Sequence, residues 1–477
     1  MPSDSPKPAK PSDTERQPQA IRMIPFIVGC ALFMQMLDAT VVATALPAMA
    51  ATMGTSVIQM NVAITSYLLS VAVFVPVSGW AADRYGARRV FIIAILLFTG
   101  SSLMCGLAQN LGQLIVARVL QGLAGAMMVP VGRIIMLRTV PKDQLLKAMA
   151  FLSMPALLGP VIGPPLGGFL VTYASWRWIF LINVPVGILG IAMVLYYIRQ
   201  DFRGAQRALD WVGFLLSGVG LATLVAGFEA LGHGMLSATN TVLVLAIGVV
   251  CTYCYILHAR HTPYPIIDLS LLKLPTFSVA TLGGNLCRFA IGANPYLLAI
   301  LLQVGFGMSP FAAGLITFTG AVGSILMKFV ATPIIQRYGF RNVLLVNAFT
   351  MGITVALCAL FQASTPLWLM MTILIAGGFF RSLQFTAVNT LTYADIKPAD
   401  MSRASSFAAT AQQLGISLGV ACSAVTLNLS MVVRGAESLE RIDIIWGFVV
   451  IGVITMLSAF SFRKLAPHAG ASLQGKA

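Results

Sequence analysis

A single acidic residue, Asp38, stands inside an apolar stretch that begins at Ile24. A charged group in hydrocarbon costs roughly 2.5–3.5 kcal/mol, so such residues usually face a cavity, a partner charge or a proton path. Arg118 lies inside a later apolar stretch and has the same need. Pairing favours the ionised carboxylate and burial the neutral one, so a moving bundle can switch Asp38 between releasing and binding a proton. The alternative for Asp38 is that it lies at a helix end and reaches interfacial water. The alternative for Arg118 is a purely structural contact with backbone carbonyls.

Three more cations, Arg288, Lys328 and Arg381, lie inside apolar stretches of the second half, where no carboxylate stands at comparable depth. Unpartnered, they would cost about 8 to 10 kcal/mol together, so we expect them to face water or an anion. Lys328 lies nearer a stretch end, and the alternative for it is to extend to the membrane surface. We assign Arg133 and Glu229 to membrane interfaces. Amide side chains are the further candidates for a binding cavity: Asn285, Gln384 and Asn389.

The composition shows which elements must position these residues. Of the 477 residues, 58% are hydrophobic and 9% charged, against about 25% charged in soluble domains. Apolar runs of about 20 residues recur along the chain, which predicts an all-α membrane protein with about 14 transmembrane helices. The runs begin near residues 24, 62, 90, 113, 146, 177, 211, 240, 277, 309, 342, 367, 405 and 441.

Lys and Arg residues concentrate in alternate loops and at both termini, which predicts that both termini are cytoplasmic. The net charge of +15 is therefore a topology signal, and we expect no nucleic-acid partner. The seven cysteines all fall in predicted spans, so no disulfide framework is indicated. Cys251 and Cys254 form a C-x-x-C without a second pair, and we expect no metal and no cofactor.

The turn from Gly79 to Arg89 reads GWAADRYGARR, and a second turn, Pro333 to Arg341, reads PIIQRYGFR with Gln336 in place of Asp83. Repeated halves are typical of transporters that alternate access around a midplane site. Asp83 can meet a helix N-terminus or an Arg of a neighbouring bundle and so hold one conformation. The alternative is a plain positively charged loop. The candidate gating residues are Gly79, Asp83, Arg84, Gly86, Arg88, Arg337 and Arg341.

Glycines recur every fourth residue in the segment GPVIGPPLGG, at positions 159, 163 and 167. They share one helix face and let another helix approach closely. We expect this face to seal the outer side of the cavity, and the alternative is generic close packing. The residues of this motif are Gly159, Gly163, Pro164, Gly167 and Gly168.

Four segments together resemble the major facilitator superfamily. The Gly79–Arg89 turn resembles its motif A, LIVARVLQGLAGA from Leu114 to Ala126 resembles motif B, and Gly159–Gly168 resembles motif C, the antiporter signature. The segment LDATVVATALP, Leu37–Pro47, is similar to the first-span motif of the fourteen-span drug:proton antiporters, although Ala43 stands where Asn is usual.

The resemblance implies the major facilitator fold, with two six-helix bundles plus two extra central spans. The expected segments are a disordered cytoplasmic tail (1–20), the N-terminal six-helix bundle (21–200), a linker with the two extra transmembrane helices (201–262), the C-terminal six-helix bundle (263–465) and a cytoplasmic tail (466–477).

The expected function is proton-coupled export of small molecules, drugs or toxic compounds, across the bacterial inner membrane by alternating access. Asp38 and Arg118 are the proton-coupling candidates. The alternative cargo is an organic anion or an anionic, citrate-like metal chelate, bound by Arg288, Arg381 and Lys328. A non-transporting sensor stays open, whereas an enzyme is disfavoured because no loop offers a nucleophile with a base. The expected partners are protons, the substrate and the lipid bilayer; the sequence does not decide whether a periplasmic adaptor is needed.

Overall fold

The computed structural model is helical throughout the part of the chain that it describes, and the expected all-α membrane fold is confirmed. It describes residues 12–55, 57–60, 62–198, 201, 203–204, 207–233, 236–436 and 438–473. Some side chains inside helices, including those of Pro164 and Glu229, also lie outside the described part. Helix α1 begins at Ser12, within the segment expected to be a disordered tail, and residues 1–11 lie outside the description.

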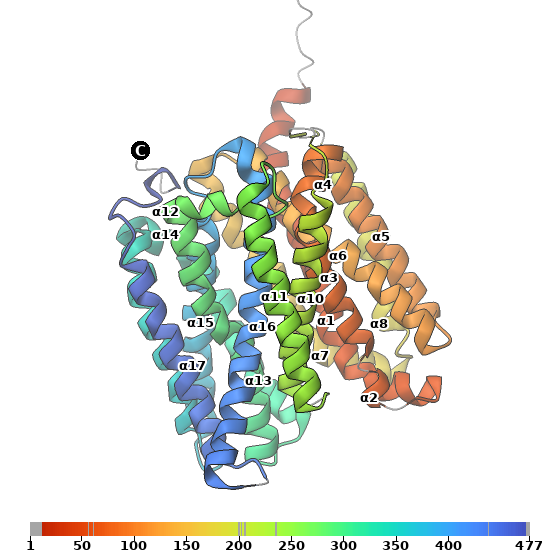
Figure 1. Ribbon diagram of the computed structural model, residues 1–477, viewed down its shortest axis with the longest axis vertical. Coiled ribbons are helices and arrows are strands. Elements are labelled where there is room, and N and C mark those ends of the chain that lie inside the picture. Colours follow the sequence, from red (N-terminus) through yellow and green to blue (C-terminus); the bar gives the residue numbers. More distant parts are fainter. Residues whose placement is uncertain are drawn as a thin grey trace, which may run out of the picture.

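The first half of the chain forms a bundle that we call the N-terminal bundle (Figure 1). Its long helices pack mainly on one another, with α1 against α7 and α6 against both α3 and α5. Its helices are α1 (Ser12–Met53), α2 (Val57–Met60), α3 (Val62–Phe74), α4 (Val77–Tyr85), α5 (Ala87–Leu107), α6 (Leu111–Thr139), α7 (Leu145–Tyr173), α8 (Trp178–Leu181) and α9 (Asn183–Tyr197).

The second half forms the C-terminal bundle, in which α14 packs against α15 and α17, and α13 against α16 and α17. Wider π-type turns flank α13 on both sides, at Val279–Gly283 and Leu301–Gly305. The helices of this bundle are α12 (Pro275–Ser278), α13 (Gly284–Ile300), α14 (Pro310–Leu357), α15 (Leu367–Leu391), α16 (Met401–Arg434) and α17 (Arg441–Phe462).

Two further helices, α10 (Trp211–His233) and α11 (Ala238–His261), lie over the seam between the bundles (Figure 1). Helix α10 packs against α3 of one bundle and α16 of the other. One apolar cluster draws on all three helices, with Ala72 from α3, Leu221 and Val225 from α10, and Leu414 from α16. The extra pair therefore contacts both bundles.

Eleven helices in the described residues are long and apolar enough to cross a membrane, and the bent pair α3 and α4 makes a twelfth. Helix α14 is 48 residues long and is broken at Gly339, and α7 has 29 residues. With α7 counted and α14 taken as two arms, the structure is compatible with about fourteen spans.

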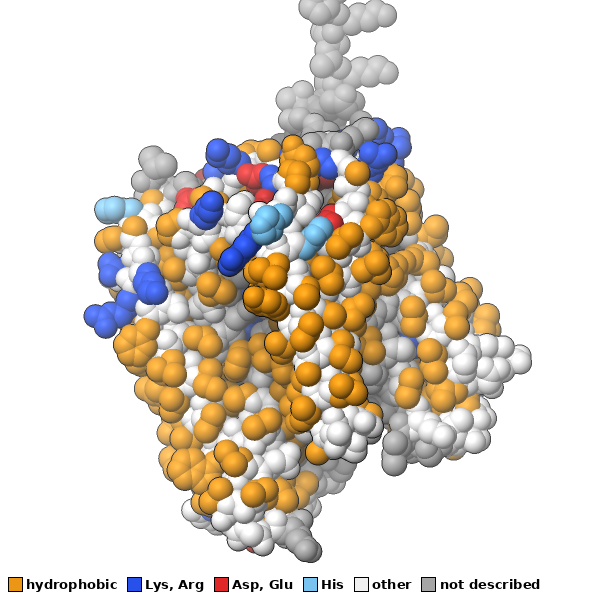
Figure 2. Space-filling view, viewed as in Figure 1, with side chains coloured by type: hydrophobic (Ala, Val, Ile, Leu, Met, Phe, Trp, Pro, Cys, Tyr) orange, Lys and Arg blue, Asp and Glu red, His pale blue; other side chains and the backbone are white. Residues whose placement is uncertain are grey.

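The two turns of the sequence repeat share one backbone feature. Gly86, between α4 and α5, has a φ of 95°, and Gly339, inside α14, has a φ of 78°. Side chains with a Cβ rarely adopt such angles, so glycine is required at both turns. We call the end of the molecule that carries these two turns the hairpin end. Figure 2 shows that the charged side chains of this face gather there, whereas the flanks below are mostly apolar.

Candidate functional site

Asp38 and Arg118 form a fully buried ion pair in the N-terminal bundle. Arg118 Nη1 lies 2.5 Å from Asp38 Oδ2, and neither side chain is exposed. Arg118 Nε also donates to the carbonyl oxygen of Ala63 at 3.1 Å, so the ion pair and the carbonyl tie occur together. The pair joins α1 to α6, and the Ala63 contact adds α3. Replacing one partner of such a buried pair by a neutral residue is strongly destabilising, because the remaining charge would be buried without a counter-charge.

Gln121, one helical turn after Arg118, closes a ring with the two charged groups. Its Nε2 donates to Asp38 Oδ1 at 3.0 Å, and its Oε1 accepts from Arg118 Nη1 at 2.7 Å. The same Nε2 lies 2.7 Å from Ser102 Oγ, which also accepts from Asn183 Nδ2 at 3.2 Å. Sequence reasoning found Gln121 only through its motif and missed Ser102 and Asn183, because polar residues without charge give no signal in an apolar run.

Aromatic rings cover the guanidinium. Arg118 Cζ lies 4.4 Å from the centroid of the Tyr67 ring and 5.9 Å from that of Phe180. Three buried polar atoms around this site, Arg118 Nη2, Tyr67 Oη and Gln35 Oε1, have no hydrogen-bond partner among the described residues. The ion pair therefore lies in a weakly polar environment, where gain or loss of one charge has large electrostatic consequences.

The glycine face of α7 packs directly on the part of α1 that carries Asp38. Added Cβ atoms on the three glycines would collide with α1, at Met36 for Gly159, at the Thr40 hydroxyl for Gly163 and at the Thr44 hydroxyl for Gly167. A Cβ on Gly168 would meet nothing within 4 Å. The expected close helix approach is thus present, and its partner is α1. Pro164 lies outside the described side chains.

Asp83, at the end of α4, contacts both bundles. Its Oδ1 accepts from Arg138 Nη2 of α6 at 3.1 Å and from Ser402 Oγ of α16 at 2.6 Å. Gly79 permits this approach, because a Cβ there would lie 2.5 Å from the Ser402 carbonyl oxygen. The arginine that meets Asp83 therefore belongs to its own bundle, and the other bundle contributes a hydroxyl instead.

The rest of the first turn is fixed by an acidic residue that sequence reasoning missed. Asp201 accepts from the backbone N of Arg88 at 3.2 Å and pairs with Arg89 Nε at 3.4 Å. A Cβ on Gly86 would overlap the Asp201 carboxylate. Arg84 is exposed. The sequence does not reveal this contact, because Asp201 lies more than 100 residues after Arg88, in a polar connecting segment.

The second turn repeats part of this arrangement. Arg341 Nη2 donates to the Arg463 carbonyl at 3.3 Å, as Arg88 Nη2 does to the Leu195 carbonyl at 3.4 Å. Arg337 lies against the Tyr338 ring, 5.5 Å from its centroid. Within the described residues no carboxylate pairs with this turn. The asymmetry expected from Gln336 is therefore visible in the contacts.

Further contacts close the hairpin end between the bundles. Ser405 Oγ of α16 donates to the Pro130 carbonyl of α6 at 3.0 Å. Ser406 Oγ lies 3.0 Å and 2.7 Å from the carbonyls of Val75 and Pro76, between α3 and α4. Together with the Asp83 contacts, they hold α16 against α4 and α6.

The cations of the C-terminal bundle are partnered by neutral groups. Arg288 donates to Asn285 Oδ1 at 2.9 Å and to Asn389 Oδ1 at 3.2 Å. Lys328 Nζ donates to Thr386 Oγ1 at 2.6 Å, so this lysine is held inside the bundle. No carboxylate pairs with Arg288 or Arg381 in the described part of the chain.

Arg288 and Gln384 line one small pocket with Cys287 and Phe385. Gln384 Nε2 donates to Cys287 Sγ at 3.3 Å, and its Oε1 accepts from Asn347 Nδ2 at 2.7 Å. Arg381 is half-buried and is not among the residues of this pocket. The structure therefore joins Arg288 to Asn285 and Asn389 by hydrogen bonds and places Arg288 and Gln384 in one pocket, which Arg381 does not line.

The assignment of Arg133 to a membrane interface is wrong. Its side chain is buried, and its Nη1 donates at 3.2 Å to the hydroxyl of Tyr393, in the turn after α15, across the boundary between the bundles. Glu229 lies outside the described side chains. Thr386 and Asn389 of α15 and Tyr393 in the turn after it bind Lys328, Arg288 and Arg133 respectively. The positions of residues along α6 cannot reveal this arrangement, because the three cations come from three different helices, α6, α13 and α14.

The described residues contain no group of three or more His, Cys, Asp or Glu side chains placed to hold a metal ion.

Repeated turns in two helical bundles and a buried ion pair between spans are features typical of secondary transporters. Two overlapping matches to the sequence model of the Major Facilitator Superfamily cover residues 28–292 and 280–476. The chain belongs to this superfamily.

Bacterial relatives match over almost the full length. The "Putative multidrug resistance protein MdtD" of Pectobacterium atrosepticum is 38% identical over 453 residues, 94% of this chain and 97% of that protein. The protein of the same name from Escherichia coli K12 is 38% identical over 452 residues, 94% of this chain and 95% of that protein.

Solved structures share the fold at low identity. The human organic anion transporter MFSD10 has a TM-score of 0.67 at 15% identity, over 93% of this chain and 99% of that chain. The proton:xylose symporter XylE has a TM-score of 0.66 at 15% identity, over 96% and 98%. The chain is therefore a multi-pass membrane transporter of this fold.

Proposed function

We propose that this transporter exports small molecules, drugs or toxic compounds, in exchange for protons across the bacterial inner membrane, with both termini in the cytoplasm. The observation that carries the proposal is the buried Asp38–Arg118 ion pair, 2.5 Å long. The names of the bacterial relatives, multidrug resistance proteins, support a drug-like cargo. The clustering of charged side chains at the hairpin end supports the orientation.

Protonation of Asp38 removes the negative charge from the pair. Arg118 then keeps the Ala63 carbonyl and the Gln121 Oε1 as partners, so its position need not change at once. The neutral carboxyl binds Arg118 less strongly, which frees α1 to move relative to α6. Because α7 packs on the same part of α1 through Gly159 and Gly163, such a movement includes α7. Proton binding is thereby coupled to helix displacement.

The contacts of α16 with α4, with α6 and with the turn between α3 and α4 close the hairpin end, which under the proposed orientation is the cytoplasmic end. Opening this end must separate Asp83 from Ser402 and withdraw Ser405 and Ser406 from their carbonyl partners. These are single hydrogen bonds worth roughly 0.5–1.5 kcal/mol each, more where the carboxylate takes part. A coupled proton or substrate can shift such a balance.

The test is pH-gradient-driven transport in proteoliposomes that contain the purified protein. A lipophilic cationic dye should accumulate inside the vesicles only when their lumen is more acidic than the medium, because protons that leave the vesicle drive the dye inward. The accumulation should collapse when the gradient is dissipated. Gradient-independent transport would contradict proton coupling. Absence of any transport or binding of dyes and organic anions would favour the sensor alternative.

The second candidate cargo is an organic anion or an anionic metal chelate. The specific observation is that Arg288 is buried and donates to two neutral amides, those of Asn285 and Asn389. Arg133 lies close enough to Arg288 to interact with it electrostatically, so positive charge from both bundles meets near α15. An anion between the bundles would offset this charge. Binding of a tricarboxylate by the purified protein, abolished in Arg288→Gln, is the expected result for this cargo.

A further inference from the structure

The connecting segments before α10 and after α11 cross the closed hairpin end. We call them the first segment (residues 203–210, of which 205–206 are not described) and the second segment (residues 262–268). The helix pair between them is mostly exposed to lipid along α11, so its bundle contacts come from α10 and these two segments.

The first segment is attached to the N-terminal bundle beside Asp83. The backbone N of Gly204 donates to the Asp83 carbonyl at 3.1 Å. Trp80 Nε1, one turn earlier in α4, donates to the Arg207 carbonyl at 3.0 Å. The segment is therefore fixed to the same helix that carries the gating carboxylate.

The second segment is attached to the C-terminal bundle beside Ser402. Asp268 pairs with Arg403, the residue that follows Ser402 in α16. Arg403 also pairs with Asp400 in the turn that precedes the helix. One arginine therefore serves both the second segment and its own helix start.

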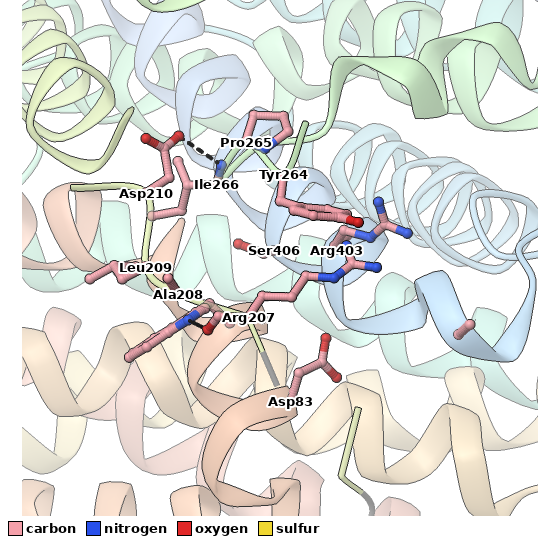
Figure 3. Close-up of a pocket in the computed structure, with 13 residues that line it drawn as sticks. Asp83, Arg207, Ala208, Leu209, Asp210, Tyr264, Pro265, Ile266, Arg403 and Ser406 are labelled. Carbon is pink, nitrogen blue, oxygen red and sulfur yellow. Dashed lines mark hydrogen bonds between the residues drawn. The ribbon is translucent and has the colours of Figure 1, made fainter. Parts of the chain in front are cut away.

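The two segments are bonded to each other. Asp210 Oδ1 caps α10 by accepting from the Gly213 backbone N at 2.8 Å and lies 2.8 Å from His258 Nε2 of α11. Asp210 Oδ2 accepts from the Ile266 backbone N at 3.3 Å. Figure 3 shows this last bond, with the Arg207 side chain reaching from the first segment toward Tyr264 and Arg403. Arg207 Cζ lies 3.9 Å from the centroid of the Tyr264 ring.

A pocket of about 610 Å³, part of it open to solvent, lies between these segments and the gate (Figure 3). Asp83, Arg207, Asp210, Tyr264 and Arg403 all line it. The segments thus meet the gate through polar contacts around a solvent-facing space. These polar contacts can break at modest cost, because water replaces the lost partners. The second segment also packs through Ile266 and Ile267 in an apolar cluster with Val77 of α4 and Phe407 of α16, which adds to the hold on both bundles.

We propose that α10 and α11, with their two connecting segments, form a strap that holds the hairpin end closed, and that the strap must release one bundle for this end to open. The argument is geometric: a unit anchored to α4 on one side and to α16 on the other resists separation of Asp83 from Ser402. The Asp268–Arg403 pair is the side-chain anchor on the C-terminal side. The proposal rests on the proposed alternation of access, but it requires neither proton coupling nor a particular cargo.

The test compares two variants that remove one partner each from the same arginine. Asp268→Asn removes the strap pair and keeps an oxygen to cap the backbone N of Ser270, whereas Asp400→Asn removes only the pair within the start of α16. The readout is the rate at which a water-soluble maleimide labels Ser405→Cys in a protein whose seven cysteines are replaced. Ser405 is fully buried between α16 and α6, so labelling reports opening.

We expect Asp268→Asn to label about two- to fivefold faster, which lies within the range for loss of a partly exposed ion pair. Asp400→Asn should label like the parent. Equal rates in all three proteins, or the larger increase in Asp400→Asn, would overturn the proposal. The readout needs no transport, so a failure of proton coupling leaves this result interpretable.

A covalent lock gives an independent test. Ala208 of the first segment and Ala399, just before α16, both line the pocket and are exposed, so a cleavable bismaleimide can join cysteines placed at both. The lock should reduce Ser405→Cys labelling at least about fivefold, and cleavage of the linker should restore it. Each single cysteine treated with the same reagent is the control. Unchanged labelling in the crosslinked protein would show that opening does not require release of the strap.

Discussion

Gly163→Ala tests whether the contact between α7 and α1 is as close as the structure shows. The new Cβ would overlap the hydroxyl of Thr40 and lie 3.0 Å from its Cβ. Thr40 cannot turn away freely, because its hydroxyl is bonded at 3.0 Å to the carbonyls of both Met36 and Leu37. Helices α7 and α1 must therefore separate. Asp38, which lies between Leu37 and Thr40 in α1, moves with this helix.

The expected cost follows from overpacking, which destabilises cores by about 1–3 kcal/mol. Alanine favours a helix over glycine by about 1 kcal/mol, so the net loss is up to about 2 kcal/mol. Gly168→Ala is the matched control, since it changes the same residue type in the same helix where a Cβ meets nothing within 4 Å. It should be neutral or slightly stabilising.

The assay is thermal unfolding of the detergent-purified protein, followed by a thiol-reactive fluorophore. Gly163→Ala should lower the midpoint by several degrees, and Thr40→Ala should restore most of the loss in the double variant, because it removes the overlapping hydroxyl. If Gly163→Ala and Gly168→Ala unfold at the same temperature, or if Thr40→Ala gives no rescue, the reasoning about this face is refuted.

Two further predictions concern the gate and the cargo. Asp83→Asn should speed labelling of a cysteine at the closed hairpin end and impair transport, because a charge-assisted pair of contacts is lost. Gln336→Asp should change the labelling rate and the transport rate little. Equal effects of the two variants would mean that both turns serve only to set the membrane topology. For an anionic cargo, Arg288→Gln should abolish tricarboxylate binding measured by calorimetry. Arg381→Lys should weaken this binding, because the point charge of lysine cannot replace the planar guanidinium of arginine. Tight binding of a cationic dye with no tricarboxylate binding by the parent protein would exclude that cargo.

The fold followed from the sequence because its signals are local. Apolar runs, alternating cationic loops and the paired glycines at positions 86 and 339 each act within a few residues, so span boundaries were predicted closely. The approach of Asp38 to Arg118 was also predictable, since both are charged residues inside apolar spans of the first half and neither tolerates isolation.

The rest of the site could not be read in this way because its contacts join distant segments. Asp201 fixes the turn at Gly86, and Ser402 meets Asp83 from the opposite bundle, yet neither residue differs locally from an ordinary loop or cap. Arg133 was misplaced for the same reason, since its partner Tyr393 lies 260 positions further along the chain. The roles of the predicted site residues in transport stay predictions.

The measurement that tests the central claim most directly compares the parent protein with Asp38→Asn in proteoliposomes. Asparagine keeps the shape and hydrogen-bonding capacity of the side chain but has no titratable group that could carry a proton. The variant should still exchange labelled substrate across the membrane without a gradient, and it should lose accumulation driven by an imposed pH gradient. Full gradient-driven accumulation by Asp38→Asn would contradict the assignment of Asp38 as the proton-coupling residue.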